Sequence, residues 1–103
     1  MSNRSRLGDP EISAALAGLP GWSHERGRLV KRYRFRDFAT AWAFMSAAAL
    51  HVHALDHHPE WSNVYADVAV ELVTHDAGGV TDRDVDLARR LESVASAFAA
   101  GGA

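Results

Sequence analysis

The sequence predicts an α+β domain, a two-layer fold in which a four-stranded antiparallel sheet carries helices on one face. The elements run helix, strand, strand, helix, strand, strand, helix, and each strand pair is joined by a turn too short for a parallel crossover. The chain has 103 residues, of which 48% are hydrophobic and 23% charged, as in one compact globular domain. We therefore expect a single domain over 1–103, with loose ends at 1–8 and 100–103.

The first helix has clear start and stop signals. Asp9 is a favourable N-cap and Pro10 suits the first helical position, so a helix is predicted from Pro10 to about Ala17. Gly18 and Pro20 follow it, and both residue types end helices.

A hairpin is predicted next, with strands at 22–25 and 28–36 around a turn at Arg26-Gly27. Apolar side chains in the longer strand alternate with arginines at positions 28, 32, 34 and 36. Such a row could track phosphates, but the whole chain has a formal net charge of −2. We expect solvent or acidic groups to neutralise the row, and no nucleic-acid partner.

A long helix follows, capped by Asp37 and running to about Leu55. Its large apolar residues form a stripe that we interpret as the core face: Phe38, Trp42, Met45, Ala49 and Val52. The helix is expected to end before His58-Pro59, because the residue before proline avoids helical geometry.

A second hairpin is predicted at 61–65 and 68–74, turning at Ala66-Asp67. A loop over 76–80 leads to Thr81, which forms a capping box with Asp84 and opens the last helix. The inner face of that helix is predicted to carry Leu87, Leu91, Val94, Ala95 and Phe98.

Composition excludes several classes of protein. The chain has no cysteine, which rules out disulfides and thiolate metal sites. Apolar runs such as 47–50 are too short to span a bilayer, and charged residues interrupt the N-terminus where a signal segment would be apolar. We expect a cytoplasmic protein with no membrane partner.

Five of the six histidines lie between positions 51 and 75. His57 and His58 follow the long helix, and pairing about the Ala66-Asp67 turn places His75 opposite His58. These three histidines are therefore predicted to converge at one end of the sheet.

Clustered imidazoles suit proton transfer, because the unperturbed pKa of histidine, about 6.5, lies near physiological pH. A protonated ring disfavours protonation of its neighbour, so such rings can divide acid and base roles. Asp56 stands beside the pair and could orient one ring. The candidate catalytic residues are His57, His58 and His75, with His53, Asp56 and Asp84 in supporting positions.

Two other interpretations of the cluster stay open. His53 and His57 are one helical turn apart, which suits metal chelation, although no cysteine or H-E-x-x-H pattern accompanies them. Alternatively, the histidines only cap a helix end and satisfy a loop. We expect no metal.

The histidine region also resembles a known family. The segments 53–61 (HALDHHPEW), 63–65 (NVY) and 74–76 (THD) are similar to the signature of pterin-4a-carbinolamine dehydratases. The resemblance extends to 21–22, 33–38, 43–45, 81–84 and 86–88, and so covers roughly residues 20 to 96.

This resemblance implies a four-stranded antiparallel sheet with helices on one side. It implies a hydro-lyase, a 4a-hydroxytetrahydrobiopterin dehydratase, which converts 4a-hydroxytetrahydropterin to quinonoid dihydropterin without metal or organic cofactor. That reaction belongs to tetrahydropterin recycling for aromatic amino-acid hydroxylases. The family's active-site histidines map to His57, His58 and His75, and its pterin contacts to His57, His58, Pro59, Thr74, His75, Asp76 and Ala77.

The resemblance also implies a homodimer or homotetramer. Some relatives act instead as transcriptional dimerisation cofactors or as chaperones of other enzymes, so a binding role without catalysis is the alternative. One position departs from the family pattern, which often has glutamate where this chain has His53. Since glutamate there would favour the imidazolium form of His57 and histidine would not, we expect a shifted pH optimum.

Overall fold

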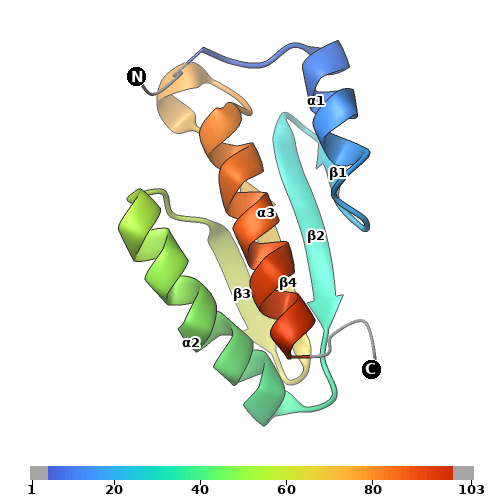
Figure 1. The fold of residues 1–103 in the computed structure, drawn as a ribbon, viewed down its shortest axis with the longest axis vertical. Helices are drawn as coiled ribbons and strands as arrows, with labels where there is room; N and C mark the ends of the chain where they lie inside the picture. The colour runs from blue at the N-terminus through green and yellow to red at the C-terminus, as the bar shows by residue number, and fades with distance from the viewer. Residues whose placement is uncertain (1–4, 99–103) are drawn as a thin grey trace.

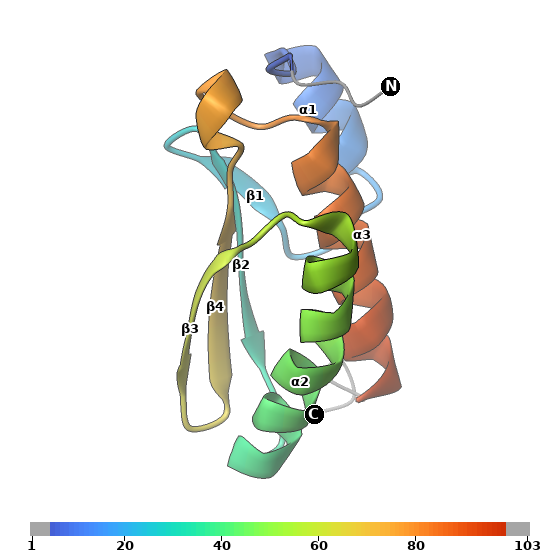
Figure 2. The ribbon, with the colours of Figure 1, turned by 90° about the vertical axis from the view of Figure 1, so that its left-hand side faces the viewer.

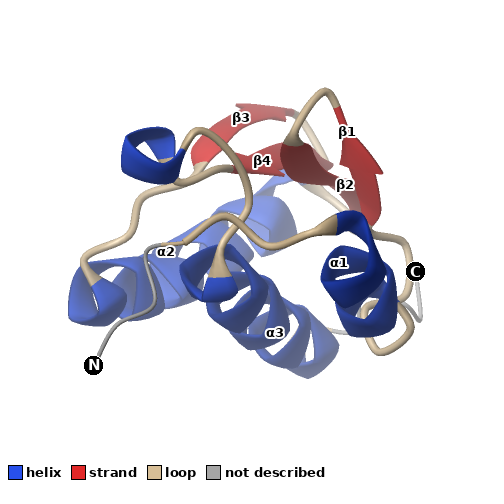
Figure 3. Ribbon diagram, turned by 90° about the horizontal axis from the view of Figure 1, so that it is seen from above, coloured by secondary structure: helices blue, strands red, loops and turns tan. Residues whose placement is uncertain are grey.

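A computed structural model describes residues 5–98 of the chain. The elements in chain order are α1 (Asp9–Leu16), β1 (Ser23–Glu25), β2 (Arg28–Arg34), α2 (Phe38–Leu55), β3 (Glu60–Val64), β4 (Asp67–Leu72), the 3₁₀ turn η1 (His75–Ala77) and α3 (Asp82–Ala97). The strands form one antiparallel sheet in the order β1-β2-β4-β3. All three α-helices lie on one face of this sheet (Figure 1), and its other face carries none of them (Figure 3). The predicted fold class is confirmed.

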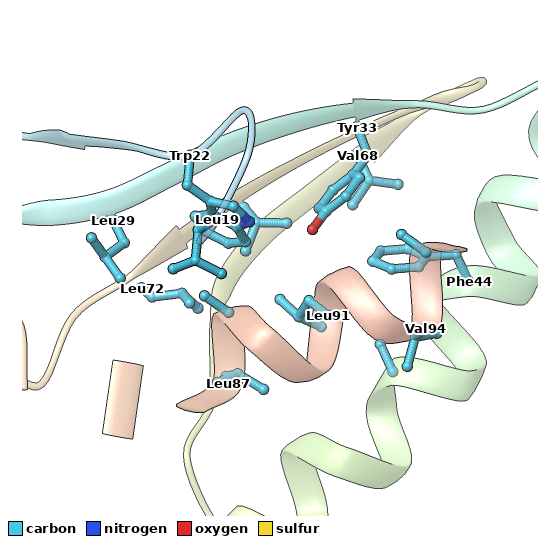
Figure 4. Packing of buried hydrophobic residues seen from close by; sticks show 14 of the residues in the cluster. Leu19, Trp22, Leu29, Tyr33, Phe44, Val68, Leu72, Leu87, Leu91 and Val94 are labelled. Atoms are coloured by element: carbon cyan, nitrogen blue, oxygen red, sulfur yellow. The ribbon is translucent and has the colours of Figure 1, made fainter. Parts of the chain in front are cut away.

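The core fills the space between the sheet and the helix layer (Figure 2). The sheet contributes the alternate residues of β2 and β4 that point toward the helices, among them Leu29, Tyr33, Val68 and Leu72 (Figure 4). The predicted inner face of α3 is confirmed, because Leu87, Leu91, Val94 and Ala95 are buried and Phe98 packs against the core.

The core face of α2 differs from the prediction. The buried residues are Ala41, Phe44, Ala48 and Val52, whereas Phe38 and Trp42 are 48% and 55% exposed and stack on each other. Phe44 packs against the rings of Tyr33 and Phe35, and small alanines on the same face let α2 approach α3 closely. By length and composition α2 is apolar enough to cross a membrane (hydropathy 1.3), a test that core helices also pass.

The N-terminal segment also differs from expectation. Helix α1 begins one residue earlier than predicted, with Gly8 as N-cap, because the Glu11 carboxylate accepts a hydrogen bond from the Gly8 N–H at 2.7 Å. Leu7 N donates to Val80 O at 2.8 Å and its side chain packs on the core, so this part of 1–8 is not loose. Positions 1–4 and 99–103, which include the expected loose C-terminus, lie outside the described residues.

The register of the second hairpin corrects the predicted turn. Val64 pairs with Asp67, so the turn residues are Tyr65 and Ala66, and Tyr65 adopts a positive φ of 52°. The Asn63 side chain donates to the carbonyls of Tyr65 and Asp67 and closes the turn. Under this register His75 is not opposite His58, and the regular ladder ends at Glu60 and Glu71.

The arginine row meets acids on the open face of the sheet. Arg28 donates to Glu60 and Glu71, and Arg34 pairs with Asp67 across the strands. Strand β2 ends at Arg34 rather than at position 36, and Arg36 pairs with its neighbour Asp37. Two of the four arginines are therefore neutralised by cross-strand partners, as the sequence led us to expect.

Candidate active site

His57 is the buried histidine of the cluster. Asp56 ends α2 in the left-handed conformation, at φ 50°, and this sharp C-cap is followed directly by His57. The His57 ring is only 8% exposed, and its Nε2 donates to Asp84 Oδ1 at 2.6 Å. The pair therefore joins the end of α2 to the start of α3.

The Asp84 carboxylate is fully buried and has three donors. Besides His57, its Oδ2 accepts from Thr74 Oγ1 at 2.8 Å and from the Thr81 N–H at 2.9 Å. The last bond belongs to the predicted capping box, and the helix N-terminus favours the negative charge. Thr81 Oγ1 lies 2.8 Å from Thr74 Oγ1 and must donate to it, because the Thr74 proton is used by Asp84.

His75 pairs with a carboxylate from a different element. It opens η1, is about 70% exposed, and its Nε2 donates to Glu60 Oε2 at 3.0 Å. Glu60 Oε1 accepts from Arg28 at 2.5 Å, and this hydrogen bond holds the pKa of Glu60 below its ordinary value. His75 is thus tied to β3 and, through Arg28, to β2.

His58 is held less firmly than the other two. Its side chain is 70% exposed, and its Nε2 lies 3.7 Å from Asp56 Oδ1, beyond hydrogen-bonding distance. The two supporting positions on α2, His53 and Asp56, are exposed. The carboxylate partner of His57 is Asp84.

The predicted substrate-contact residues fall into two groups. Thr74 is buried and its hydroxyl bonds to Asp84, so it serves the interior of the site. His75, Asp76 and Ala77 form η1 at the surface, and Pro59 is half-buried beside His58. Figure 1 shows η1 beside the N-terminal end of α3, which carries Asp84.

Two further residues shape the site and were missed at the level of sequence. Arg83 donates to the carbonyl oxygens of Leu55 at 3.1 Å and Asp56 at 2.9 Å, and so holds the end of α2 that carries His57. Glu60 holds His75. Glu60 follows the His-His-Pro segment, which is the only signal that could have found it. Nothing in the spacing of Arg83 indicated its contact with α2.

The arrangement is suited to proton transfer. His57 and His75 each direct Nε2 to a carboxylate, which fixes the ring and leaves Nδ1 as the nitrogen that can meet a substrate. The three histidines lie at the end of the sheet where β3 begins and β4 ends, and the hydrogen bonds to Asp84 and Glu60 hold His57 and His75 there. Among residues 5–98, no group of three His, Asp or Glu side chains is placed to hold a metal ion.

Comparisons with known proteins identify a family for this chain. The family model described as "Pterin 4 alpha carbinolamine dehydratase" matches residues 5–94. A protein of Rhodopseudomonas palustris named "Putative pterin-4-alpha-carbinolamine dehydratase" is 52% identical over 93 residues, which are 88% of this chain and 92% of that protein. A protein of Novosphingobium aromaticivorans with the same name is 53% identical over 91 residues, covering 86% of this chain and 95% of that one.

Solved structures agree. The crystal structure of a "transcriptional coactivator/pterin dehydratase" from Brucella melitensis has a TM-score of 0.85 and 41% identity, and the match covers 87% of this chain and 98% of that one. A pterin dehydratase-like protein described as a RuBisCO assembly factor in the alpha-carboxysome has a TM-score of 0.60 at 23% identity, covering 72% and 86% of the two chains, which shows the fold alone. This chain belongs to the pterin 4 alpha carbinolamine dehydratase family.

Proposed function

We propose that this protein dehydrates 4a-hydroxytetrahydropterins to quinonoid dihydropterins by acid–base catalysis with histidines. The observation that carries the proposal is the pair of carboxylate-held imidazoles, His57 on Asp84 and His75 on Glu60, at one end of the sheet. Membership of the family supplies the substrate class.

The reaction needs two proton transfers. The bond between C4a and its hydroxyl oxygen breaks, and the hydroxyl takes a proton from an acid and leaves as water. A base removes the proton of the adjacent ring N–H, whose electrons form the new carbon–nitrogen double bond. We assign these transfers to His57 and His75, and binding of the pterin to His58 with Pro59 and the segment 74–77. The carbinolamine is reactive already, so positioned acid–base catalysis suffices.

Replacement of the histidines tests this assignment. His57→Ala or His75→Ala should lower kcat/KM by about 100-fold or more, the scale of a positioned proton-transfer group. His24→Ala is the matched control, because His24 is an exposed histidine on β1 outside the cluster, and it should keep wild-type rates. Wild-type rates in both cluster variants, with folded protein by circular dichroism, would exclude the assignment.

We propose that the enzyme works without metal or organic cofactor. Elemental analysis of protein purified without added metal should find no stoichiometric metal, and a chelator should leave dehydration unchanged. One tightly bound zinc per chain, lost together with activity, would reverse this conclusion.

We also propose a cytoplasmic homodimer or homotetramer that recycles tetrahydropterin for an aromatic amino-acid hydroxylase. Two exposed apolar surfaces would be covered by self-association. One is the stacked pair of Phe38 and Trp42 on α2, and the other is Val64 at the end of the edge strand β3 with Tyr65 in the turn that follows. Light scattering at micromolar concentration should give a multiple of 11.2 kDa, and a monomer would contradict the proposal.

A second candidate function is a binding or assembly factor without catalysis. It is favoured by the same exposed aromatic pair on α2, and by relatives described as a transcriptional coactivator and as an assembly factor. A folded wild-type protein that fails to dehydrate 4a-hydroxypterins would favour this role. Binding to nucleic acid is not proposed, since Arg28 and Arg34 are already paired with acids.

A further inference from the structure

Glu60 stands between a cation and a histidine. Its two oxygens are used separately, Oε1 by Arg28 at 2.5 Å and Oε2 by His75 Nε2 at 3.0 Å. The Glu60 carboxylate comes from β3, the guanidinium from β2 and the imidazole from η1, so three elements meet at this one side chain. No role for Glu60 follows from the family match, which concerns the chain as a whole.

We propose that Glu60, held by Arg28, is a positioning residue that binds the Nε2–H of His75 and presents Nδ1 of that ring to the substrate. A neutral imidazole carries one N–H, and the carboxylate can only accept. The hydrogen bond to Glu60 therefore selects the tautomer with hydrogen on Nε2 and fixes the ring orientation. This inference rests on the proposed function for its catalytic consequence, but the tautomer itself is a property of the free protein.

Arg28 keeps the Glu60 carboxyl ionised, the form that accepts from His75. The Arg28 guanidinium donates to Glu60 at 2.5 Å and to Glu71 at 2.9 Å, and Arg26 lies 3.6 Å from the other oxygen of Glu71. The hydrogen bond from Arg28 lowers the pKa of Glu60, so the carboxylate stays ionised through the neutral range. A carboxylate that is fixed on one oxygen has a defined direction for the other, and His75 lies in that direction.

The second pair makes the arrangement coherent. His57 also directs Nε2 to a carboxylate, Asp84 Oδ1, at 2.6 Å. In both rings Nε2 is hydrogen-bonded to a carboxylate, and Nδ1 is the nitrogen left to meet the substrate. Asp84 does this from the interior at the start of α3, and Glu60 does it from the surface of β3.

The free protein gives the first test. In ¹⁵N-labelled protein at alkaline pH, two-dimensional spectra that link ring nitrogens to carbon-bound protons should show Nε2 of His75 protonated and Nδ1 unprotonated. In Glu60→Ala the share of the Nδ1–H tautomer should rise. A wild-type His75 that carries its proton on Nδ1, or a tautomer unchanged by Glu60→Ala, would overturn the proposal. Because no substrate is present, either result is independent of the proposed reaction.

The catalytic test uses a matched pair of glutamates. Glu60 and Glu71 are direct cross-strand partners and both bind Arg28, but only Glu60 binds His75. Glu60→Ala should lower kcat about 10-fold, with KM within about 2-fold, which is the scale expected for a group that orients a catalytic histidine. Glu60→Gln, whose amide oxygen still accepts from Nε2–H, should recover part of this loss. Glu71→Ala should stay within about 2-fold of wild type.

The pattern separates positioning from a structural effect. If Glu60→Ala and Glu71→Ala lose activity equally, the losses come from the Arg28 ion-pair network and the proposal is wrong. If neither wild type nor variants dehydrate the pterin while the His75 tautomer still depends on Glu60, the proposed function has failed and the positioning of the ring stands.

Discussion

Two carboxylates on α3, about two turns apart, each accept several hydrogen bonds. Near the start of the helix, Asp84 accepts from the His57 ring, the Thr74 hydroxyl and the Thr81 N–H. Two turns later, Glu92 Oε2 accepts from Trp22 Nε1 at 3.1 Å, Lys31 Nζ at 2.6 Å and Tyr33 OH at 2.5 Å. Each accepts three hydrogen bonds, from donors that the fold brings together from distant parts of the chain as well as from nearby ones.

The two clusters differ in whether a donor residue keeps a further polar atom that is not hydrogen-bonded. Around Glu92, Trp22 and Tyr33 each spend their one N–H or O–H proton on the carboxylate, and Lys31 also donates to Pro20 O at 2.7 Å. Around Asp84, the His57 ring keeps one nitrogen uncommitted. The Glu92 cluster therefore holds elements of the fold together, whereas the Asp84 cluster also leaves one nitrogen of His57 available for the proton transfer proposed above.

The largest effect is expected at Asp84. In the wild type, three donors share the two oxygens of Asp84. Asp84→Asn leaves only one acceptor oxygen for these donors, so the His57 tautomer is no longer fixed. We expect kcat/KM to fall by about 100-fold. Asp86→Asn on the same helix, a half-exposed partner of Arg90, is the matched control and should stay near wild type. Steady-state kinetics of the folded variants measure this difference. Equal activity in both variants would show that Asp84 has no part in catalysis.

The opposite profile is expected at Glu92. Glu92→Ala leaves three partly buried donors without their acceptor, and the unfolding free energy should fall by about 2 kcal/mol. For a domain of this size the Tm should drop by roughly 10 °C. The variant should keep kcat/KM within about 2-fold of wild type below its Tm, and exposed Ser93→Ala serves as control. If Glu92→Ala lost activity but kept its Tm, the Glu92 cluster would act on activity rather than on stability, and the distinction between the two clusters would be wrong.

Acid should weaken the Glu92 cluster in a defined direction. Burial by itself would raise the pKa of Glu92, but the hydrogen bonds from Lys31 and Tyr33 outweigh it and hold the pKa below its ordinary value. Such a carboxyl stabilises the fold fully above its unfolded pKa, about 4.3, and the contribution is lost as pH falls through the folded pKa. Urea unfolding should show a constant gap between wild type and Glu92→Ala above about pH 5.5, narrowing below about pH 4.5. A gap that persists unchanged to pH 3 would contradict this.

The smallest effect is expected at Arg83, which links α3 to the chain segment carrying His57. Arg83→Gln removes two hydrogen bonds to carbonyls at the end of α2. We expect a loss of about 1 kcal/mol in unfolding free energy and a several-fold lower kcat/KM, since the ring is less well placed. Arg89→Gln, an exposed arginine two turns along α3, is the control. Identical kinetics in the two variants would show that the hydrogen bonds from Arg83 to the end of α2 are not needed for activity.

Local signals predicted most of this molecule. The helix caps at Asp37 and Thr81 act within three residues, and the structure has both. The alternation in β2 and β4 assigned each side chain to the correct face, because a strand has a period of two. The Thr81 and Asp84 spacing also pointed, through a capping box, at the residue that holds His57.

The errors have physical causes of their own. Shifting the β3–β4 pairing by two residues leaves every side chain on the same face, so alternation could not choose between Ala66-Asp67 and the observed turn. Helix α2 is apolar on several sides, and its rotation is set by packing of Ala41, Phe44 and Ala48 rather than by the bulk of its aromatic residues. The contact of Glu60 with Arg28 depends on the sheet order, which brings β2 and β3 to either side of β4.

The hydroxyl chain behind Asp84 has a direction. Thr81 donates to Thr74 and Thr74 donates to Asp84, with all three side chains buried, so each hydroxyl hydrogen already points toward the carboxylate. The hydroxyl chain therefore supplies Asp84 with a donor on the side away from His57 and leaves Oδ1 for the ring. In the reaction proposed above, His57 then exchanges its proton through Nδ1, because Nε2 stays bound to Asp84.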